Sequence, residues 1–136
     1  MYRETLSLQT DGRDTYEITN EIARVVEAAG VEDGMCNVFV QHTSASLIIQ
    51  ENADPDVQHD LNVWMARLVT DGDKIFRHRA EGPDDMSAHI RSVLSDVSLN
   101  IPVAGGRCVL GTWQGVFLWE HRTSPHRRKV TVTVWS

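Results

Sequence analysis

The sequence predicts an α+β fold, in which one compact domain combines a mixed or antiparallel β-sheet arrangement with about three helices. Strand-like segments occupy both ends of the chain, and three stretches of helical periodicity lie between them. No internal repeat or low-complexity segment interrupts this order. A chain of 136 residues with 41% hydrophobic composition can bury one core, so we expect a single domain over residues 1–136.

The first third of the chain predicts a strand, a helix and a further strand region. Residues 2–8 alternate in the manner of a strand. Apolar residues recur every three or four positions over residues 15–29, which predicts a helix that stops at Gly30 in a left-handed cap. Residues 35–41 predict a strand covered on both faces, with residues 47–50 as its continuation or partner.

Two more helices are predicted in the middle of the chain. The segment Asp54-Pro55-Asp56 combines an N-cap, a proline at the first helical position and a carboxylate suited to the helix dipole. This helix should run to about Val69, with an apolar stripe formed by Val57, Leu61, Trp64, Met65 and Leu68. Residues 74–83 follow as a polar loop. A third, short helix then starts at Asp84-Asp85, and its apolar face is formed by Met86, Ile90, Val93 and Leu94.

The last part of the chain predicts strands joined by short connections. Gly105-Gly106 has the composition of a tight turn. The predicted strands cover residues 97–103, 107–110, 116–120 and 128–135.

Charge and apolar patterning exclude several classes of protein. Nineteen acidic against thirteen basic residues give a net charge of −6, which argues against a nucleic-acid partner. No apolar run approaches the roughly 18 residues of a membrane span, and the start of the chain has no signal-like core, so we expect a cytoplasmic protein without a membrane partner. Cys36 and Cys108 lack a Cys-x-x-Cys spacing and are expected to be buried free thiols rather than a disulfide or redox pair.

Three histidines are candidate metal ligands. His42 closes a predicted strand, His78 lies in the polar loop, and His89 lies on the third helix, so they converge if the loop folds back over the strand end. Asp85, one turn before His89, can accept a hydrogen bond from a ring nitrogen. Three imidazoles with an open fourth position suit a zinc-like ion. The alternative for each histidine is a hydrogen-bonded structural role.

Carboxylates form a second group of candidates. Asp60 interrupts the apolar stripe of the second helix, and an ion buried there must be paired, hydrogen-bonded or functional. Together with Glu51, Asp54 and Asp56 it could hold magnesium through waters, although capping of the helix is the favoured role for Asp54 and Asp56. The candidate catalytic carboxylates are Glu51, Asp60 and Asp85.

Polar side chains at strand ends are candidate substrate contacts. Gly111 and Gly115 bracket a hydroxyl, an indole and an amide, which indicates either a binding wall where a ligand comes close or a hairpin with Trp113 in the core. The candidates here and after the second strand region are Thr43, Ser44, Ser46, Asn52, Thr112 and Gln114.

Positive charge concentrates between Arg122 and Lys129. Arg127 and Arg128 suit bidentate phosphate contacts, and charges that protect an edge strand have the same pattern. No Walker loop, dinucleotide glycine fingerprint or nucleophile elbow is present, which argues against ATPase, dehydrogenase and serine-hydrolase functions.

Three stretches together resemble the YjbQ-like family, small proteins labelled secondary thiamine-phosphate synthases. The similarity covers nearly the whole chain, and the one departure is Ser87, where the family pattern has proline after Met86. The stretches are His42-Thr43-Ser44-Ala45-Ser46 with residues 51–57, His78 with residues 81–90, and residues 110–115 with Trp119-Glu120-His121-Arg122.

The resemblance implies a compact α+β fold that assembles as a homotrimer. It also implies a weak or secondary transferase activity, which joins a pyrimidine diphosphate to a thiazole phosphate and releases pyrophosphate. The family's motif histidines fall on His42, His78 and His89, which favours a divalent metal, zinc first and magnesium second.

Two hypotheses of different class follow. The first is an enzyme acting on a small phosphorylated metabolite, either a transferase of the thiamine-phosphate synthase type or a metal-dependent hydrolase of a phosphorylated or amide substrate. The second is a non-catalytic trimer that binds a small anion or metabolite.

Overall fold

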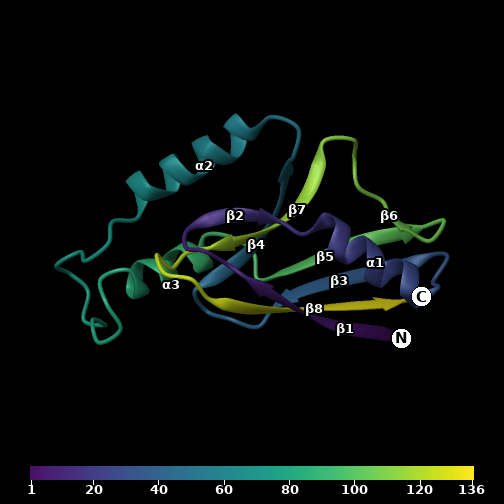
Figure 1. The fold of residues 1–136 in the computed structure, drawn as a ribbon, viewed down its shortest axis with the longest axis horizontal. Coiled ribbons are helices and arrows are strands. Elements are labelled where there is room, and N and C mark those ends of the chain that lie inside the picture. The colour runs from purple at the N-terminus through teal and green to yellow at the C-terminus, as the bar shows by residue number, and fades with distance from the viewer.

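The computed structural model describes all 136 residues as two antiparallel sheets with three helices, which confirms the predicted α+β class (Figure 1). Every strand pairing is antiparallel. The larger sheet has the order β1 (Tyr2–Gln9), β8 (Arg127–Trp135), β3 (Gly34–Val40), β5 (Ser98–Ala104) and β6 (Arg107–Cys108). The smaller sheet has the order β2 (Asp14–Glu17), β7 (Gln114–Glu120) and β4 (Ala45–Glu51).

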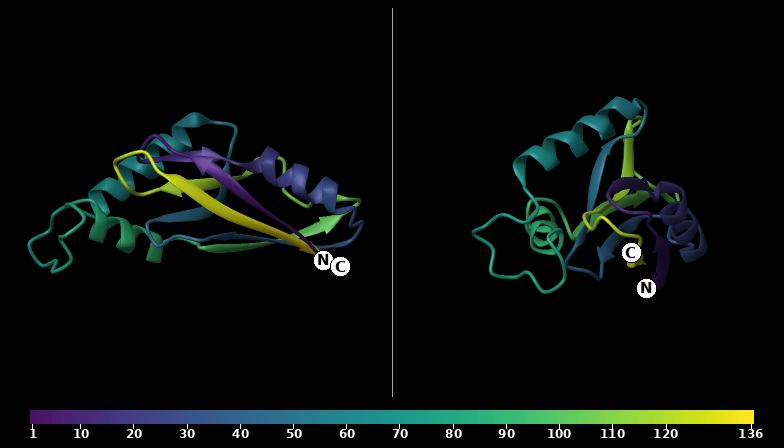
Figure 2. Two further views of the ribbon diagram at one scale, coloured as in Figure 1. Left: turned by 60° about the horizontal axis from the view of Figure 1, so that its bottom comes forward. Right: turned by 60° about the vertical axis from the view of Figure 1, so that its left-hand side comes forward.

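The main core lies between the two sheets, and α1 (Thr19–Ala29) contributes to it (Figure 2). Strand β8 shows why: Val130, Val132 and Val134 alternate toward the core and are fully buried, as the two-residue period of a strand requires. Seventeen buried side chains from both sheets and α1 form one cluster. This core holds the strand ends on which the candidate site residues lie.

Helix α1 begins later than its periodicity predicts. Residues 14–17 form strand β2 instead, in which Tyr16 pairs with Leu118 of β7. Pairing with β7 satisfies the backbone groups of this short segment, and the helix starts only after Ile18. The predicted end is confirmed, because Gly30 adopts a left-handed φ of 65°.

The predicted two-sided burial belongs to a different strand. On β3, Phe39 is 43% exposed, so only the face with Val38 and Val40 is covered. Strand β4 does not continue or pair with β3; it joins β7 in the smaller sheet. Strand β7 is the strand buried on both faces, since the core covers one face and α2 (Pro55–Leu68) covers the other.

Helix α2 is capped as predicted and packs differently. The Asp54 side chain accepts a hydrogen bond from the Asp56 backbone N–H at 2.9 Å. The predicted apolar stripe is correct for Leu61 and Met65 and wrong for Trp64 and Leu68, which are 56% and 53% exposed. Asp60 lies on the exposed surface. The buried contacts come from Leu61, Met65 and Val69, spaced four residues apart, against Ile48, Trp119 and Ile90.

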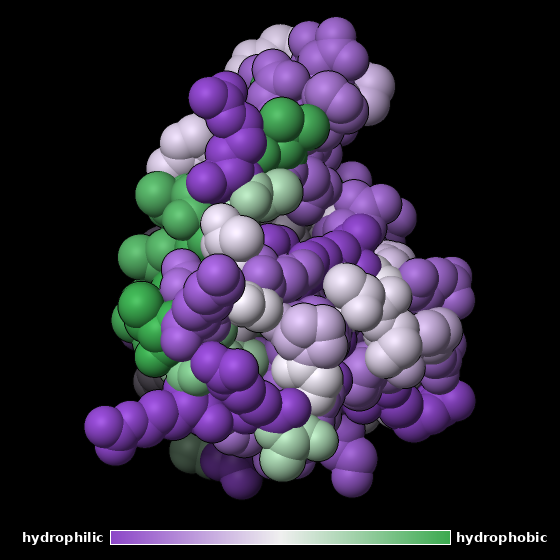
Figure 3. Space-filling model, turned by 90° about the vertical axis from the view of Figure 1, so that its left-hand side faces the viewer, coloured by the Kyte–Doolittle hydropathy of each residue, from purple (hydrophilic) through white to green (hydrophobic).

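Helix α3 (Asp85–Val93) starts where predicted, and its predicted apolar face is only half correct. Its buried residues are Asp85, Ser87, Ala88, Arg91 and Ser92. Ile90 of the predicted face packs against the Met65 cluster, whereas Val93 is 83% exposed and Leu94 53% exposed, so these two point outward. Figure 3 views this end of the molecule and shows hydrophobic side chains gathered along one side of it, beside mostly hydrophilic surface.

The carboxyl-terminal strands follow the prediction with two corrections. Gly105 and Gly106 form the predicted turn with φ of 59° and 74°, as a tight hairpin turn with two positive φ values requires. The strand predicted over 107–110 shortens to β6. Trp113 is 63% exposed, so it does not lie in the core. No helix in the molecule combines the length and apolar character needed to cross a membrane.

Candidate functional site

Two imidazoles and one carboxylate converge at the start of α3. The donor atoms of His78, Asp85 and His89 all lie within 4.8 Å of one another. Asp85 Oδ2 lies 2.6 Å from His78 Nε2 and 3.1 Å from His89 Nε2. Asp85 and His89 meet because they are one helical turn apart, and the loop before α3 brings in His78.

Arg122 fixes the carboxylates at this position. Its Nη1 atom lies 2.9 Å from Asp85 Oδ1, and its Nε donates to Asp84 Oδ2 at 2.9 Å. Asp85 is only 3% exposed at its side chain. Although burial opposes ionisation, the hydrogen bond from His78 and the charges of His89 and Arg122 hold the pKa of Asp85 below its usual value. Asp85 is therefore a buried anion with one oxygen held by arginine and the other turned to the histidines.

The backbone of Thr43 sets the proton position on His89. Nδ1 of His89 lies 2.9 Å from the Thr43 carbonyl oxygen, which can only accept, so Nδ1 carries a hydrogen. In the neutral ring Nε2 then presents a lone pair to Asp85 Oδ2, and two acceptors face each other. A proton or a cation between them removes the repulsion. Two imidazoles and a carboxylate, with the outer nitrogen of one ring hydrogen-bonded, are a donor set that fits zinc.

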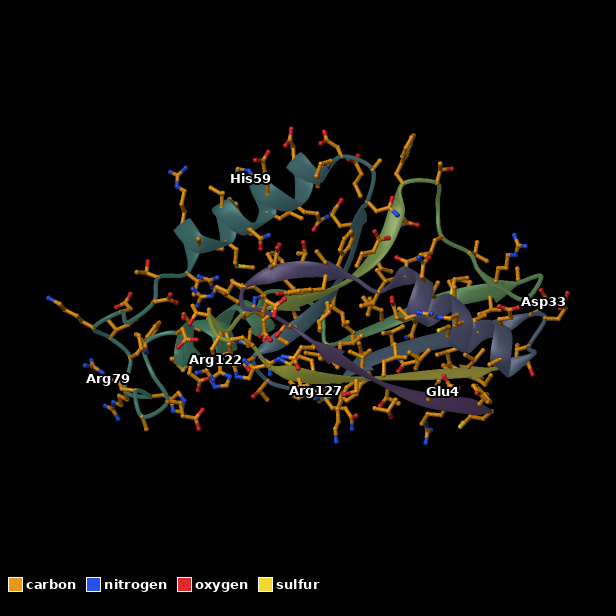
Figure 4. All side chains as sticks on the ribbon, viewed as in Figure 1. Glu4, Asp33, His59, Arg79, Arg122 and Arg127 are labelled. Carbon is orange, nitrogen blue, oxygen red and sulfur yellow. The ribbon has the colours of Figure 1, made fainter.

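The imidazole pair lies between two hollows. His89 lines one of about 360 Å³, together with His42, Thr43, Ser92, Ser95 and two valines. His78 lines the other, of about 280 Å³, on the loop side, with Phe76 and Arg79 among its neighbours. Figure 4 places Arg122 at the same end of the molecule and His59 on the outer side of α2.

His42 lies outside the three-residue cluster. Its Nε2 accepts the Lys129 backbone N–H at 2.8 Å, so the ring proton resides on Nδ1. Burial, followed by the charge of Arg128, lowers the pKa of His42 and keeps it neutral. Of the three predicted ligands, the structure thus brings two together, adds Asp85 to them, and leaves His42 on the wall of the neighbouring hollow, where its Nε2 accepts a hydrogen bond from the Lys129 backbone.

A buried polar network explains several predicted substrate contacts. Arg128 forms an ion pair with Glu120 and donates to Ser44 Oγ at 3.0 Å. Ser46 Oγ lies 2.8 Å from His121 Nε2, and both residues are buried. Burial and then the charge of Arg91 lower the pKa of His121 to about 3, so this ring stays neutral. Ser44, Ser46 and Arg128 are occupied inside the fold and do not face the cluster.

Glu51, Asn52 and Gln114 gather at the far end of the smaller sheet. Glu51 pairs with Gln114, and the Asn52 N–H donates to the Trp113 carbonyl. The length of β4 places Glu51 about 20 Å from Ala45, the strand end beside α3. A side chain at Gly115 would lie 2.9 Å from the Asn52 Cβ, so this glycine serves the close approach of two segments.

The remaining candidates are exposed. Asp60 bonds only to its neighbour His59, at 3.0 Å, and both side chains are more than two thirds exposed. Arg127 lies on the outer surface of β8 and donates to Ser7. Thr112 is exposed in the connection before β7. None of these side chains belongs to the cluster at α3.

Sequence reasoning missed the groups that hold the cluster in place. Arg13 donates through two nitrogens to both oxygens of Asp71, each at 2.7 Å, and its Nε donates to the His121 carbonyl. Ser87, the residue that departs from the family pattern, donates to Asp71. The partners in these contacts lie 16 to 108 positions apart, so no local pattern could connect them. In the sequence, Arg122 stands out only as the start of the basic segment, and nothing local predicts its ion pair with Asp84.

Comparison with known proteins identifies the relatives of this chain. The sequence profile described as "UPF0047 protein YjbQ-like" matches residues 4–136. The chain belongs to this family. It is 54% identical to UPF0047 protein sll1880 of Synechocystis sp., over 98% of this chain and 90% of that protein. It is 40% identical to UPF0047 protein YjbQ of Escherichia coli O157:H7, over 98% of this chain and 96% of that protein.

Solved structures share the fold. An uncharacterised yjbq/upf0047 family protein from Clostridium acetobutylicum aligns with a TM-score of 0.89 at 37% identity, over 97% of this chain and 99% of that one. Hypothetical protein APE1520 from Aeropyrum pernix K1 aligns with a TM-score of 0.91 at 26% identity, over 100% of this chain and 99% of that one. The predicted resemblance to the YjbQ-like family is therefore confirmed.

Proposed function

We propose that this YjbQ-like protein is a metal-dependent enzyme that hydrolyses a small phosphorylated metabolite, with His78, Asp85 and His89 as the ligands. The convergence of these three donors, with the His89 proton fixed on Nδ1 by Thr43, is the observation that supports the proposal. Zinc is the expected ion, because nitrogen and oxygen donors in this ratio suit it, and magnesium is the second candidate. Such an ion would supply Lewis-acid stabilisation of a phosphate oxygen.

The residues of the chain itself orient the site. Arg122 holds one oxygen of Asp85, so the other oxygen stays directed at the imidazoles. The Thr43 carbonyl fixes the ring of His89. His42, with its proton on Nδ1, can donate to an oxygen of a substrate in the adjacent hollow. Neutralisation of the phosphate charge would then fall to the ion and to Arg79, which lines the hollow of His78 and has no carboxylate partner, since Arg122 and Arg128 are already paired.

The ion pairing of the arginines favours hydrolysis over the thiamine-phosphate synthase reaction. That transfer releases pyrophosphate, which carries more negative charge than a single phosphate and needs free cationic groups. Arg128 is committed to Glu120, Arg122 to Asp84 and Asp85, and Arg127 lies on the outer surface. Arg79 alone among the residues lining the His78 hollow offers a guanidinium without a carboxylate partner, which suits one phosphate better than a pyrophosphate. The synthase reaction therefore stays a prediction of the family resemblance, and hydrolysis ranks first on the geometry.

Association of the chain into a trimer is part of the proposal. Val93, Leu94 and Val97 are all more than 40% exposed and lie beside the hollow that His89 lines. Apolar side chains that lie together on a surface favour burial against a partner. The homotrimer implied by the family would cover them, and sedimentation of the native protein tests this directly.

Metal analysis is the first experiment. The protein, purified without chelators or a histidine tag, should contain about one zinc ion per chain by mass spectrometry of the elements. His89→Gln should lose it, whereas His59→Gln, which changes an exposed histidine on α2, should retain it. The double variant Glu51→Ala, Asp60→Ala should retain it as well. A full complement of metal in His89→Gln would rule out the ligand set.

Activity is measured on the metal-loaded wild type. Release of inorganic phosphate from a panel of small phosphomonoesters and diphosphates should be abolished by His89→Gln and unaffected by His59→Gln. The formation of thiamine phosphate from its two precursors is measured in parallel. If the wild type forms it, the transferase reaction is favoured over hydrolysis. Metal binding with neither activity would favour the non-catalytic metabolite-binding alternative.

A further inference from the structure

A second cavity lies at the opposite end of the molecule from the histidine cluster. It has a volume of about 440 Å³ and lies between α1 and the β5–β6 hairpin, which Figure 1 shows at the far end from α3. This volume falls in the range of small-molecule pockets, roughly 300–1,000 Å³. Its walls are mostly apolar, formed by Ile22, Val26, Leu110 and Val116, and Cys108 is part of its lining.

The two cysteines of the chain are arranged in depth behind this cavity. Cys108 on β6 is partly exposed, and Cys36 on β3 is completely buried. Strand β5 lies between β3 and β6, so the two Cα atoms are about two strand spacings, roughly 10 Å, apart. A disulfide allows only about 7 Å, so the thiols cannot bond to each other without backbone movement. Cys108 therefore remains a free thiol that faces a cavity.

We propose that Cys108 is a covalent modification site for small uncharged electrophiles of the α,β-unsaturated carbonyl class that enter this cavity. The thiol of Cys108 would give up its proton to water, the thiolate sulfur would attack the β-carbon of the double bond, and the π-electron pair would move to the carbonyl oxygen as an enolate. The α-carbon then takes a proton from water, so no group leaves and no oxidant is needed. An uncharged reagent is expected because the charges of Glu27 and Arg107 at the cavity are opposite, and most of the remaining side chains, Thr19 excepted, are apolar.

The second thiol supports this assignment of the nucleophile. The hydrogen bond from Cys36 lowers the pKa of Cys108, and the same contact, together with burial, raises the pKa of Cys36. Because the thiolate is the reactive form, the accessible sulfur is favoured and the buried one is kept as a neutral donor. Cys36 acts here as a positioning residue, since it is fully buried and cannot meet the reagent.

Labelling of the native protein with N-ethylmaleimide tests the proposal. Intact mass and peptide mapping should show one adduct per chain, at Cys108, while the urea-unfolded protein gains two. Cys108→Ser should remove the adduct in the native protein. Labelling of Cys36 in preference, or no adduct on the folded wild type, would overturn the proposal. The metal content reports independently on the histidine cluster at α3. It should be the same before and after labelling, and the same in Cys108→Ser as in the wild type.

Two matched substitutions on α1 test whether the cavity is the route. Ala23 lines the cavity and is exposed at its mouth, and Ala28 is exposed on the same helix outside it. Ala23→Leu should slow labelling about tenfold or more by blocking the approach geometry, and Ala28→Leu should leave the rate unchanged. Equal rates in the two variants would show that the reagent reaches Cys108 from open solvent, which would contradict a binding cavity.

Discussion

The helices at the two ends of the molecule, α1 and α3, bury opposite kinds of side chain. Helix α1 buries Ile22, Val25 and Val26 against the core. Helix α3 buries Asp85, Ser87, Arg91 and Ser92 and leaves Val93 exposed. Burial of apolar surface stabilises a fold by about 25 cal/mol per Å², whereas burial of charge is tolerated only when the charge is paired. The α1 end is thus built for stability, and the α3 end carries buried charge that its site requires.

Substitution within the buried ion pair should have the largest effect on stability. Arg128→Met leaves the Glu120 carboxylate buried without its guanidinium, and should lower the free energy of unfolding by about 3–5 kcal/mol. Arg127→Met changes the neighbouring exposed arginine and should cost less than about 0.5 kcal/mol. Urea unfolding at pH 7 measures both. Equal midpoints for the two variants would show that the polar network is not structural.

Truncation on the two helices tests their contrast directly. Ile22→Ala removes a side chain that is 1% exposed and should cost about 2–5 kcal/mol through a cavity in the core. Val93→Ala on α3 should change the stability of the monomer by less than about 0.5 kcal/mol, because the side chain is 83% exposed. The comparison is made by urea unfolding at low protein concentration. A large loss for Val93→Ala that grows with concentration would place this residue in the subunit interface.

Arg122→Gln should separate site function from stability. The substitution leaves Asp85 without the cation that orients it, and zinc affinity should fall about 10- to 100-fold, as for other groups that hold a metal ligand. Arg77→Gln is the matched control in the adjacent exposed loop. Competition with a coloured chelator gives both affinities. If Arg122→Gln binds zinc as tightly as wild type, Asp85 is not oriented by this arginine.

Acid should weaken the α3 end, and this is the smallest expected effect. Burial opposes ionisation of Asp84, but the hydrogen bonds from Arg122 and Thr123 lower its pKa strongly, and the pKa of Asp85 is also lowered. A carboxylate with a depressed folded pKa contributes stability above its unfolded pKa of about 3.9 and loses it as the pH falls toward the folded value. Asp84→Asn should therefore flatten the decline of the urea midpoint below about pH 4, relative to wild type. An unchanged slope would contradict this assignment.

Local signals in the sequence predicted much of this architecture. The Asp54 cap, the Gly30 stop and the Gly105-Gly106 turn depend on a few neighbouring residues, and all three are confirmed. The approach of a His89 ring nitrogen to the Asp85 carboxylate, at 3.1 Å, follows from the four-residue spacing on a helix and is also present. Such features could be predicted because their partners are close in the chain.

The errors arose where partners are distant. Periodicity on α3 predicted that Val93 faces inward, but the helix lies over polar strand ends and Arg91 is buried instead. Strand β2 has four residues and is defined by its pairing with β7, more than a hundred positions away. The link between Arg122 and Asp84 spans 38 positions. No local pattern contains this information, because the tertiary fold alone brings these groups together.

The position of His78 and His89 between two hollows affects how a substrate enters the site and how a product leaves it. Each ring borders a separate opening, one toward the loop after α2 and one toward the strand ends. An ion held by both rings would be accessible from both hollows. A reactant could therefore enter through one hollow while the product leaves through the other. A compound that binds in one hollow would then slow turnover while the other hollow stays accessible to substrate.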